Sequence, residues 1–218
     1  MKQVSLPFVF RGGKRKGAGR KPNGKRPGVA HRVREEINRL IPCHVTVRLQ
    51  EGLPSLRRER ERRVVIEALR AGKKRFGLTL VHYSIQSNHL HLLVEVAQAK
   101  ALARGMQGLL VRIAKRLNRL WERRGKVVAD RFYSRLLQTP REVRNALVYV
   151  LNNFIKHRRR LPETGLDRFA SGWWFSGWLE VKGRAFTRLT PVMAATSWLL
   201  KVGWRRYGKV SIRAVPGS

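Results

Sequence analysis

The sequence predicts an α+β fold, in which an antiparallel sheet carries helices on one face. First, 43% of the 218 residues are hydrophobic, which is enough for one core of moderate size. Second, short segments that alternate apolar and polar residues, as strands do, are interleaved with longer segments that have the helical period. Third, glycine or proline stands at or near the ends of several of these segments.

The first predicted strand and helix begin near residue 41. Residues 41–49 alternate apolar and polar side chains, which is typical of a strand. Residues 53–75 follow as a helix, which Pro54 and Ser55 open and which ends near Gly72 and Gly77. Its core-facing stripe consists of Leu56, Val64, Val65, Ala68 and Leu69.

Two adjacent strands are predicted next, at residues 77–86 and 89–96, with Ser87 and Asn88 as the turn of a hairpin. In the second strand His89 and His91 project from one face, whereas Leu90, Leu92 and Val94 project from the other. Two imidazoles side by side on a rigid strand are suited to hold a metal ion. The alternative is an ordinary strand with two histidines at half-exposed positions.

Residues 100–124 have a clean helical period and form the second predicted helix. The apolar stripe contains Leu102, Met106, Leu109, Leu110, Ile113, Leu117, Leu120 and Trp121. Basic residues lie mostly off that stripe, where they can meet phosphate: Arg104, Arg112, Lys115, Arg116, Arg119, Arg123 and Arg124. Gly125 ends the helix, and residues 127–137 are predicted as a further strand. The resulting order, β-α-β-β-α-β, is that of the ferredoxin-like sandwich.

One more helix, at residues 140–157, follows this sheet-forming part, with Thr139 as N-cap and Pro140 in its first turn. Val143, Leu147, Val150, Leu151 and Phe154 form its core stripe. Tyr149 points away from the stripe, toward a polar face that also holds Asn145, Asn152, Asn153 and Lys156. A structural tyrosine usually lays its ring against the core. Asn153 comes one helical turn after Tyr149, and an amide oxygen with two imidazoles is a ligand set that divalent metals accept.

The charge of the chain is extreme, because 48 Lys and Arg against 13 Asp and Glu give a net charge of +35. A field of that size implies a polyanionic partner, nucleic acid first and an anionic membrane surface second. No apolar run approaches the length of about 18 residues that a membrane span requires, and we expect a cytoplasmic protein associated with nucleic acid. Cys43 is the single cysteine, which excludes an intrachain disulfide and a cysteine zinc site.

The chain divides by composition into three parts. Residues 1–40 are predicted to be a mobile, basic DNA-binding arm, in which Arg15, Lys16, Arg20 and Lys21 meet phosphates. The sequence Gly-Arg-Lys-Pro at 19–22 resembles an AT-hook core, so reading of the minor groove and sequence-independent phosphate binding both remain open. Residues 41–160 hold the predicted strands and helices, and residues 161–218 form a Trp-rich, basic extension. The tryptophans at 173–178 either stack bases or pack as a lid.

The histidine motif on the predicted strand and the tyrosine motif on the predicted helix together resemble those of a known family. His89-Leu90-His91, followed by a helical Tyr149 with Asn153, resembles the HUH single-strand endonucleases of the single-tyrosine class, and among them the REP-associated tyrosine transposases. The resemblance runs from about residue 41 to 157 and includes the runs GMQGL at 105–109, RFYS at 131–134 and LVYVLNN at 147–153. Many relatives have Pro-Asn before the first histidine, whereas this chain has Ser87-Asn88.

The resemblance implies a function. His89, His91 and Asn153 would bind Mg²⁺ or Mn²⁺, and Tyr149 would attack a phosphate of single-stranded DNA to give a 5′-phosphotyrosine intermediate. Lys156 would help Tyr149 to lose its proton. The DNA backbone would be held by Arg112, Lys115, Arg116 and Arg119. The implied partner is hairpin-forming, palindromic repeat DNA, bound by a nucleoid-associated monomer or homodimer that carries out DNA transposition.

The main alternative is a non-catalytic, basic nucleic-acid-binding protein, either a ribosomal-type RNA-binding domain or a domesticated transposase that no longer cuts. Charge and fold class suit this alternative equally well. It does not explain why His89 and His91 are followed by Tyr149 and Asn153, and this combination is what separates the two interpretations.

Overall fold

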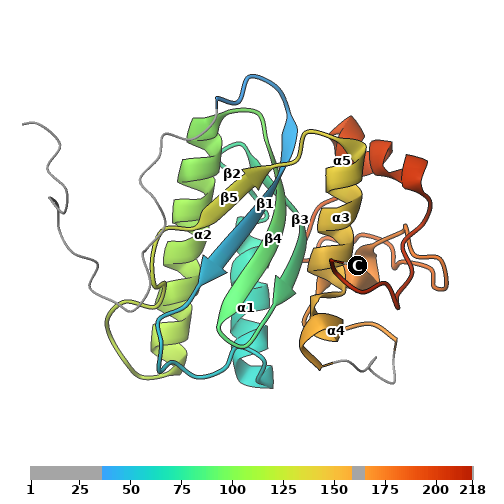
Figure 1. Cartoon of the computed structure of the whole chain (residues 1–218). Helices are drawn as coiled ribbons and strands as arrows, with labels where there is room; N and C mark the ends of the chain where they lie inside the picture. The colour runs from blue at the N-terminus through green and yellow to red at the C-terminus, as the bar shows by residue number, and fades with distance from the viewer. Residues whose placement is uncertain (1–35, 159–164, 218) are drawn as a thin grey trace, which may run out of the picture.

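An antiparallel sheet with helices against both of its faces organises the part of the chain that the computed structural model describes, residues 36–158 and 165–217 (Figure 1). The α+β class is therefore as the sequence predicts, but the helices are not confined to one face of the sheet. In chain order the elements are β1 (Ile41–Arg48), α1 (Glu59–Gly72), β2 (Lys74–Arg75), β3 (Leu78–Ile85), β4 (His89–Val96), α2 (Ala99–Leu120), β5 (Tyr133–Leu136), α3 (Pro140–Leu151), α4 (Asn153–Arg158), η1 (Ser171–Trp174), α5 (Trp198–Lys201) and η2 (Gly203–Tyr207).

The strands lie in the order β2-β3-β4-β1-β5, and each paired neighbour is antiparallel. β3 and β4 form the predicted hairpin, and β1 pairs with β4 over its whole length. In that register Thr46 lies opposite His91 and His44 lies opposite Leu93. β5 pairs with β1 and forms one edge of the sheet.

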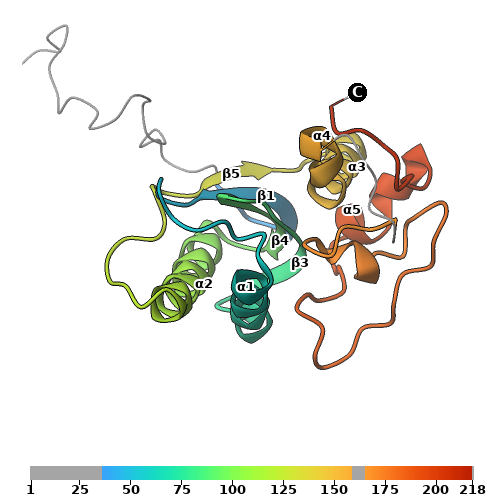
Figure 2. The ribbon, with the colours of Figure 1, turned by 90° about the horizontal axis from the view of Figure 1, so that it is seen from below.

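The alternation of side chains along β4 separates two hydrophobic clusters. Leu90, Leu92 and Val94 belong to the cluster that includes residues of α1 and α2. Leu93 belongs to the second cluster, together with α3 and the C-terminal part of the chain. Figure 2 shows α1 and α2 grouped apart from α3, with the sheet between them. His91 shares the face of Leu93, so it lies on the side of the sheet that α3 covers.

Several element ends differ from the predicted ones. The helix predicted at 53–75 begins only at Glu59, because the preceding residues turn back to the β3–β4 hairpin, where Leu56 N donates to Ser87 O. The strand predicted at 127–137 shortens to β5, and Val128 makes only an isolated bridge with Leu49. The helix predicted at 140–157 is interrupted at Asn152.

The start of α3 is as predicted. Thr139 is the N-cap, and its hydroxyl accepts from Glu142 N while the Glu142 carboxylate accepts from Thr139 N. Pro140 occupies the first turn, where a missing N–H costs nothing. This capping box fixes where the helix begins, and therefore where Tyr149 lies along it.

The C-terminal residues pack against the second cluster. Trp178 and Trp204 are buried, and their indole N–H groups donate to Gly172 O and Leu200 O. The packing interpretation is therefore right for Trp178, while Trp173 and Trp174 remain half-buried. No helix in the described part of the chain is long and apolar enough to cross a membrane.

A buried ion pair anchors this C-terminal part to the rest of the fold. Arg57 donates to both carboxylate oxygens of Asp167 at 2.8 Å, and its side chain and that of Asp167 are 13% and 2% exposed. The guanidinium also lies 4.3 Å from the centroid of the Phe169 ring.

We expect Asp167→Asn to lower the free energy of unfolding by about 3 kcal/mol, because the substitution leaves the Arg57 charge buried without its counter-ion. Urea denaturation followed by tryptophan fluorescence measures this change. Glu67→Gln is the matched control, since the Glu67–Arg116 pair is exposed and its loss should cost less than about 1 kcal/mol. Equal losses in the two variants would contradict the anchoring role of Asp167.

Candidate active site

Three imidazoles and one phenol gather where β4, β1 and α3 meet. The ring centroid of Tyr149 lies 5.0 Å from that of His91 and 5.6 Å from that of His44. The rings of His89 and His91 are 4.8 Å apart. The structure therefore brings together the two predicted histidines and the predicted tyrosine, although about sixty residues separate them in the sequence.

The ring orientation of the two predicted ligand histidines follows from their hydrogen bonds. His89 Nδ1 lies 2.9 Å from Asn88 Oδ1, an oxygen that can only accept. His91 Nδ1 lies 3.2 Å from both Thr46 Oγ1 and His44 Nε2. Because the Nδ1 atoms are engaged in this way, Nε2 of each ring is the nitrogen suited to ligate a metal.

His44 is a member of this cluster that the sequence did not assign. It lies on β1, on the same face of the sheet as Thr46, and contacts both His91 and Tyr149. Burial, and to a smaller extent the nearby charge of Arg135, lower the pKa of His44 to about 4. At neutral pH it is therefore an uncharged imidazole, which adds no positive charge beside the predicted metal ligands.

Asn153 differs from its predicted setting. The sequence predicts Asn152 and Asn153 on a polar face with Tyr149; in the structure both side chains are buried, at 1% and 0% exposure. Asn152 donates to the carbonyls of Ser211 and Ala214, at the point where the helix is interrupted. Both polar side-chain atoms of Asn153 are buried without a hydrogen-bonding partner among the described residues. A buried side-chain amide is normally paired with a polar or charged group, and a cation bound to its oxygen would satisfy that requirement.

The side chains of this site can hold a divalent metal only if the ligands are of more than one kind, imidazole nitrogens together with an amide oxygen. No group of three or more His, Cys, Asp or Glu side chains that could hold a metal occurs in residues 36–158 and 165–217. A metal bound by His89 and His91 therefore needs a ligand of another kind, and the buried amide oxygen of Asn153 is of that kind. Two imidazoles and an amide leave coordination positions for water and phosphate, as Mg²⁺ and Mn²⁺ require.

The structure describes the side chains of only four of the nine residues predicted to contact DNA. Arg15, Lys16, Arg20 and Lys21 are outside the described residues, and so is the side chain of Lys156, which belongs to α4. Arg112, Lys115, Arg116 and Arg119 are on α2, which packs on the face of the sheet opposite α3. Arg116 is paired with Glu67 at 2.7 Å. The structure does not bring these four side chains together with Tyr149.

The remaining tyrosines have other surroundings. Tyr83 is buried in the cluster of α1 and α2, and burial raises the pKa of its phenol. Tyr133 and Tyr207 are exposed, at 55% and 48%. Tyr149 is the tyrosine that packs against His91.

Comparison with known proteins gives a family match. The family model described as "Transposase IS200 like" matches residues 40–150. A REP-associated tyrosine transposase, solved bound to a REP hairpin, superposes with a TM-score of 0.52 at 13% identity and covers 65% of this chain and 82% of its own. A transposase structure from Deinococcus radiodurans R1 gives a TM-score of 0.39 at 13% identity, over 52% of this chain and 87% of its own. The comparison with curated proteins finds no match.

His82, on β3, is buried at 5% exposure against Ser171 and Phe175. Burial lowers the pKa of His82 to about 3, from a usual value near 6.5. Between these values the unfolded chain binds a proton that the folded chain does not. The stabilisation by neutral His82 is therefore complete above pH 6.5 and is lost as the pH falls toward 3.

We therefore expect the free energy of unfolding to fall with decreasing pH below about 6.5, by up to about 1.4 kcal/mol per pH unit from this one group. His82→Gln removes this titrating group and should reduce the slope by its share, leaving the share of His44, whose pKa burial also lowers, whatever the effect of the substitution at pH 7. Urea midpoints measured from pH 7 to pH 4.5 give both slopes. Parallel curves for the two proteins would show that His82 is not the group responsible.

Proposed function

The chain belongs to the family of IS200-like transposases, and from this premise we propose that it cuts and rejoins single-stranded DNA with Tyr149 as the nucleophile. The observation that supports this role most directly is the contact of the Tyr149 ring with His91, at 5.0 Å between centroids. The phenol comes from a capped helix and the imidazoles from two paired strands, so elements of regular structure hold every group.

The proposed reaction is a transesterification. The Tyr149 oxygen attacks the phosphorus of a phosphodiester, and the bond to the 3′-oxygen of the preceding nucleotide breaks. The products are a 5′-phosphotyrosine link and a free 3′-hydroxyl, which receives the proton that the phenol has lost. A second 3′-hydroxyl can attack the same phosphorus and release Tyr149. Because each step exchanges one phosphate ester for another, no ATP is required.

We propose that His89, His91 and Asn153 hold Mg²⁺ or Mn²⁺. When bound, the ion supplies neutralisation of the charge on the phosphate oxygens. The residues around the ligands do the orienting: Asn88 holds the ring of His89, and Thr46 with His44 holds the ring of His91. The exclusion of solvent from His91, which is 3% exposed, strengthens its contacts with Thr46 and His44.

The proposed substrate is palindromic repeat DNA that folds into a hairpin beside a single strand. Two features support it: the structural likeness to a protein that was solved with a REP hairpin, and the net charge of +35. Since Arg112, Lys115, Arg116 and Arg119 lie across the sheet from Tyr149, we assign them to parts of the DNA remote from the cut. The basic arm and Lys156 are assigned to phosphate contacts, and association with the nucleoid follows from these interactions.

We expect the purified protein to become covalently attached to a hairpin-bearing single strand in the presence of Mn²⁺. The adduct is seen as a shift on a denaturing gel with labelled DNA. Tyr149→Phe should abolish it while leaving DNA binding intact, because only the hydroxyl is lost. Tyr133→Phe is the matched control and should form the adduct normally. Persistence of the adduct in Tyr149→Phe would overturn the nucleophile, and binding without any adduct in the unaltered protein would favour the non-catalytic alternative.

We also expect a metal requirement that depends on the residues around the histidines. Removal of divalent ions with a chelator should stop adduct formation, and His91→Ala should lower its rate by at least about 100-fold at saturating Mn²⁺. Thr46→Val removes only the hydroxyl that bonds His91 Nδ1, and should raise the Mn²⁺ concentration for half-maximal rate by about 10-fold. Equal rates with and without chelator would exclude the metal site.

A further inference from the structure

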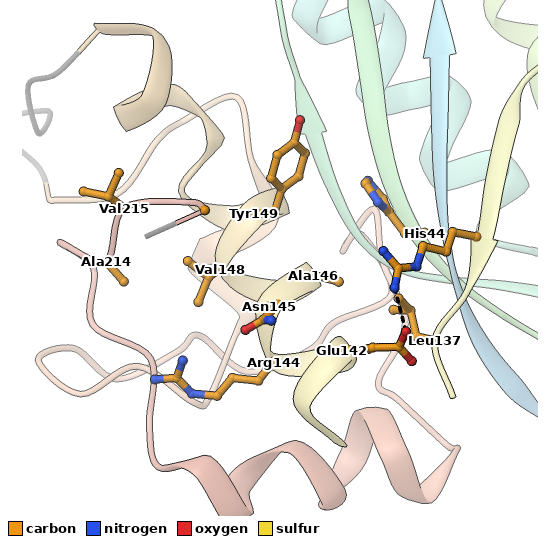
Figure 3. Close-up of a pocket in the computed structure, with 12 residues that line it drawn as sticks. His44, Leu137, Glu142, Arg144, Asn145, Ala146, Val148, Tyr149, Ala214 and Val215 are labelled. Atoms are coloured by element: carbon orange, nitrogen blue, oxygen red, sulfur yellow. Dashed lines mark hydrogen bonds and ion pairs between the residues drawn. The ribbon is translucent and has the colours of Figure 1, made fainter. Parts of the chain in front are cut away.

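A cavity of about 370 Å³ lies beside Tyr149, on the side of α3 away from its buried stripe (Figure 3). α3 contributes Asn145 and Tyr149, the β5 edge contributes Arg135, and the C-terminal segment contributes Ala214 and Val215. His44 also lines the cavity, so the phenol and one imidazole of the candidate active site form part of its wall. The cavity therefore adjoins the nucleophile.

The lining combines apolar surfaces with a few polar groups, as ligand pockets do. Apolar contacts come from Leu137, Val148 and Val215. The amide of Asn145 offers both a donor and an acceptor, and Figure 3 shows it on α3 between Val148 and Ala146. A planar ring with apolar faces and a polar edge is complementary to such a lining, which is the chemistry of a nucleobase.

The charges of the cavity favour a ligand that carries phosphate. Arg135 and Arg144 line it, against one carboxylate, Glu142, which is 2.7 Å from Arg135. Burial would raise the pKa of Glu142, but hydrogen bonds from the Gln138 and Thr139 backbone and from Arg135 lower it overall, so the carboxylate stays ionised and keeps Arg135 in place. The volume lies near the lower end of the range of small-molecule pockets, about 300–1,000 Å³, which suits one nucleotide and excludes a paired stem.

We propose that this cavity binds the base of one unpaired nucleotide next to the phosphate that Tyr149 attacks, with Asn145 bonded to the edge of the base and Arg144 near the adjoining phosphate. This assignment rests on the proposed function and deepens it, because it makes the protein itself a reader of sequence at the cut. Loss of a good amide–base contact corresponds to a rise in Kd of roughly 5- to 150-fold.

The experiment uses the full chain with Tyr149→Phe, so that binding is measured without cleavage and the ring that lines the cavity is kept. Hairpin oligonucleotides are prepared with an abasic site at each unpaired position in turn, and Kd is measured by fluorescence anisotropy. We expect the abasic site to weaken binding about 10-fold at one position, and this effect to disappear when Asn145→Ala is added. Asn145 is exposed, so the variant should fold normally.

Gln107→Ala, which removes an exposed amide on α2, is the matched control and should leave the abasic pattern unchanged. If no position depends on Asn145, or if Asn145→Ala weakens every oligonucleotide equally, the base-binding assignment is overturned. These results are independent of whether the unaltered protein forms a covalent adduct, so failure of the proposed chemistry and failure of the base pocket can be told apart.

Discussion

The pairing of β1 with β4 is the constraint on which the site depends. It places Thr46 opposite His91 and thereby supplies the contacts that orient the imidazole. In a strand every second side chain points to the same face, so a slip of one residue would move His44 and Thr46 to the opposite face and Cys43 and Val45 out of the core. The register is therefore enforced by hydrophobic burial on the other side of the sheet.

The same face of β4 supports the C-terminal part of the chain. Two residues beyond Leu93 on this face, Glu95 is buried, and its carboxylate accepts hydrogen bonds from the backbone and hydroxyl groups of Thr196 and Ser197. Ser197 is in turn the N-cap of α5. One strand thus carries the candidate metal ligands at its start and the anchor of the extension at its end, and a substitution that unsettles the strand would disturb both.

Elements whose pattern is local were predicted well from the sequence. The strand at 89–96 has the predicted bounds, because polar and apolar residues alternate along it except at Leu93 and a turn precedes it. The start of α3 was predicted because the residues that cap it, from Thr139 to Glu142, are neighbours in the sequence. His44 was missed because its role depends on which strand lies next to it, and no local pattern gives that. The burial of Asn152 and Asn153 was not predicted, because the carbonyls of Ser211 and Ala214 that accept from Asn152 lie far along the chain.

The two edges of the sheet have a consequence for how copies of the chain meet. One edge is β2, whose two residues are Lys74 and Arg75, and the other is the four-residue β5, in which Arg135 is largely exposed. Short strands with cationic side chains are poor templates for a further strand, since an approaching identical edge brings like charges together. Copies of the chain are therefore disfavoured from joining their sheets edge to edge, and the charge on both edges keeps them apart.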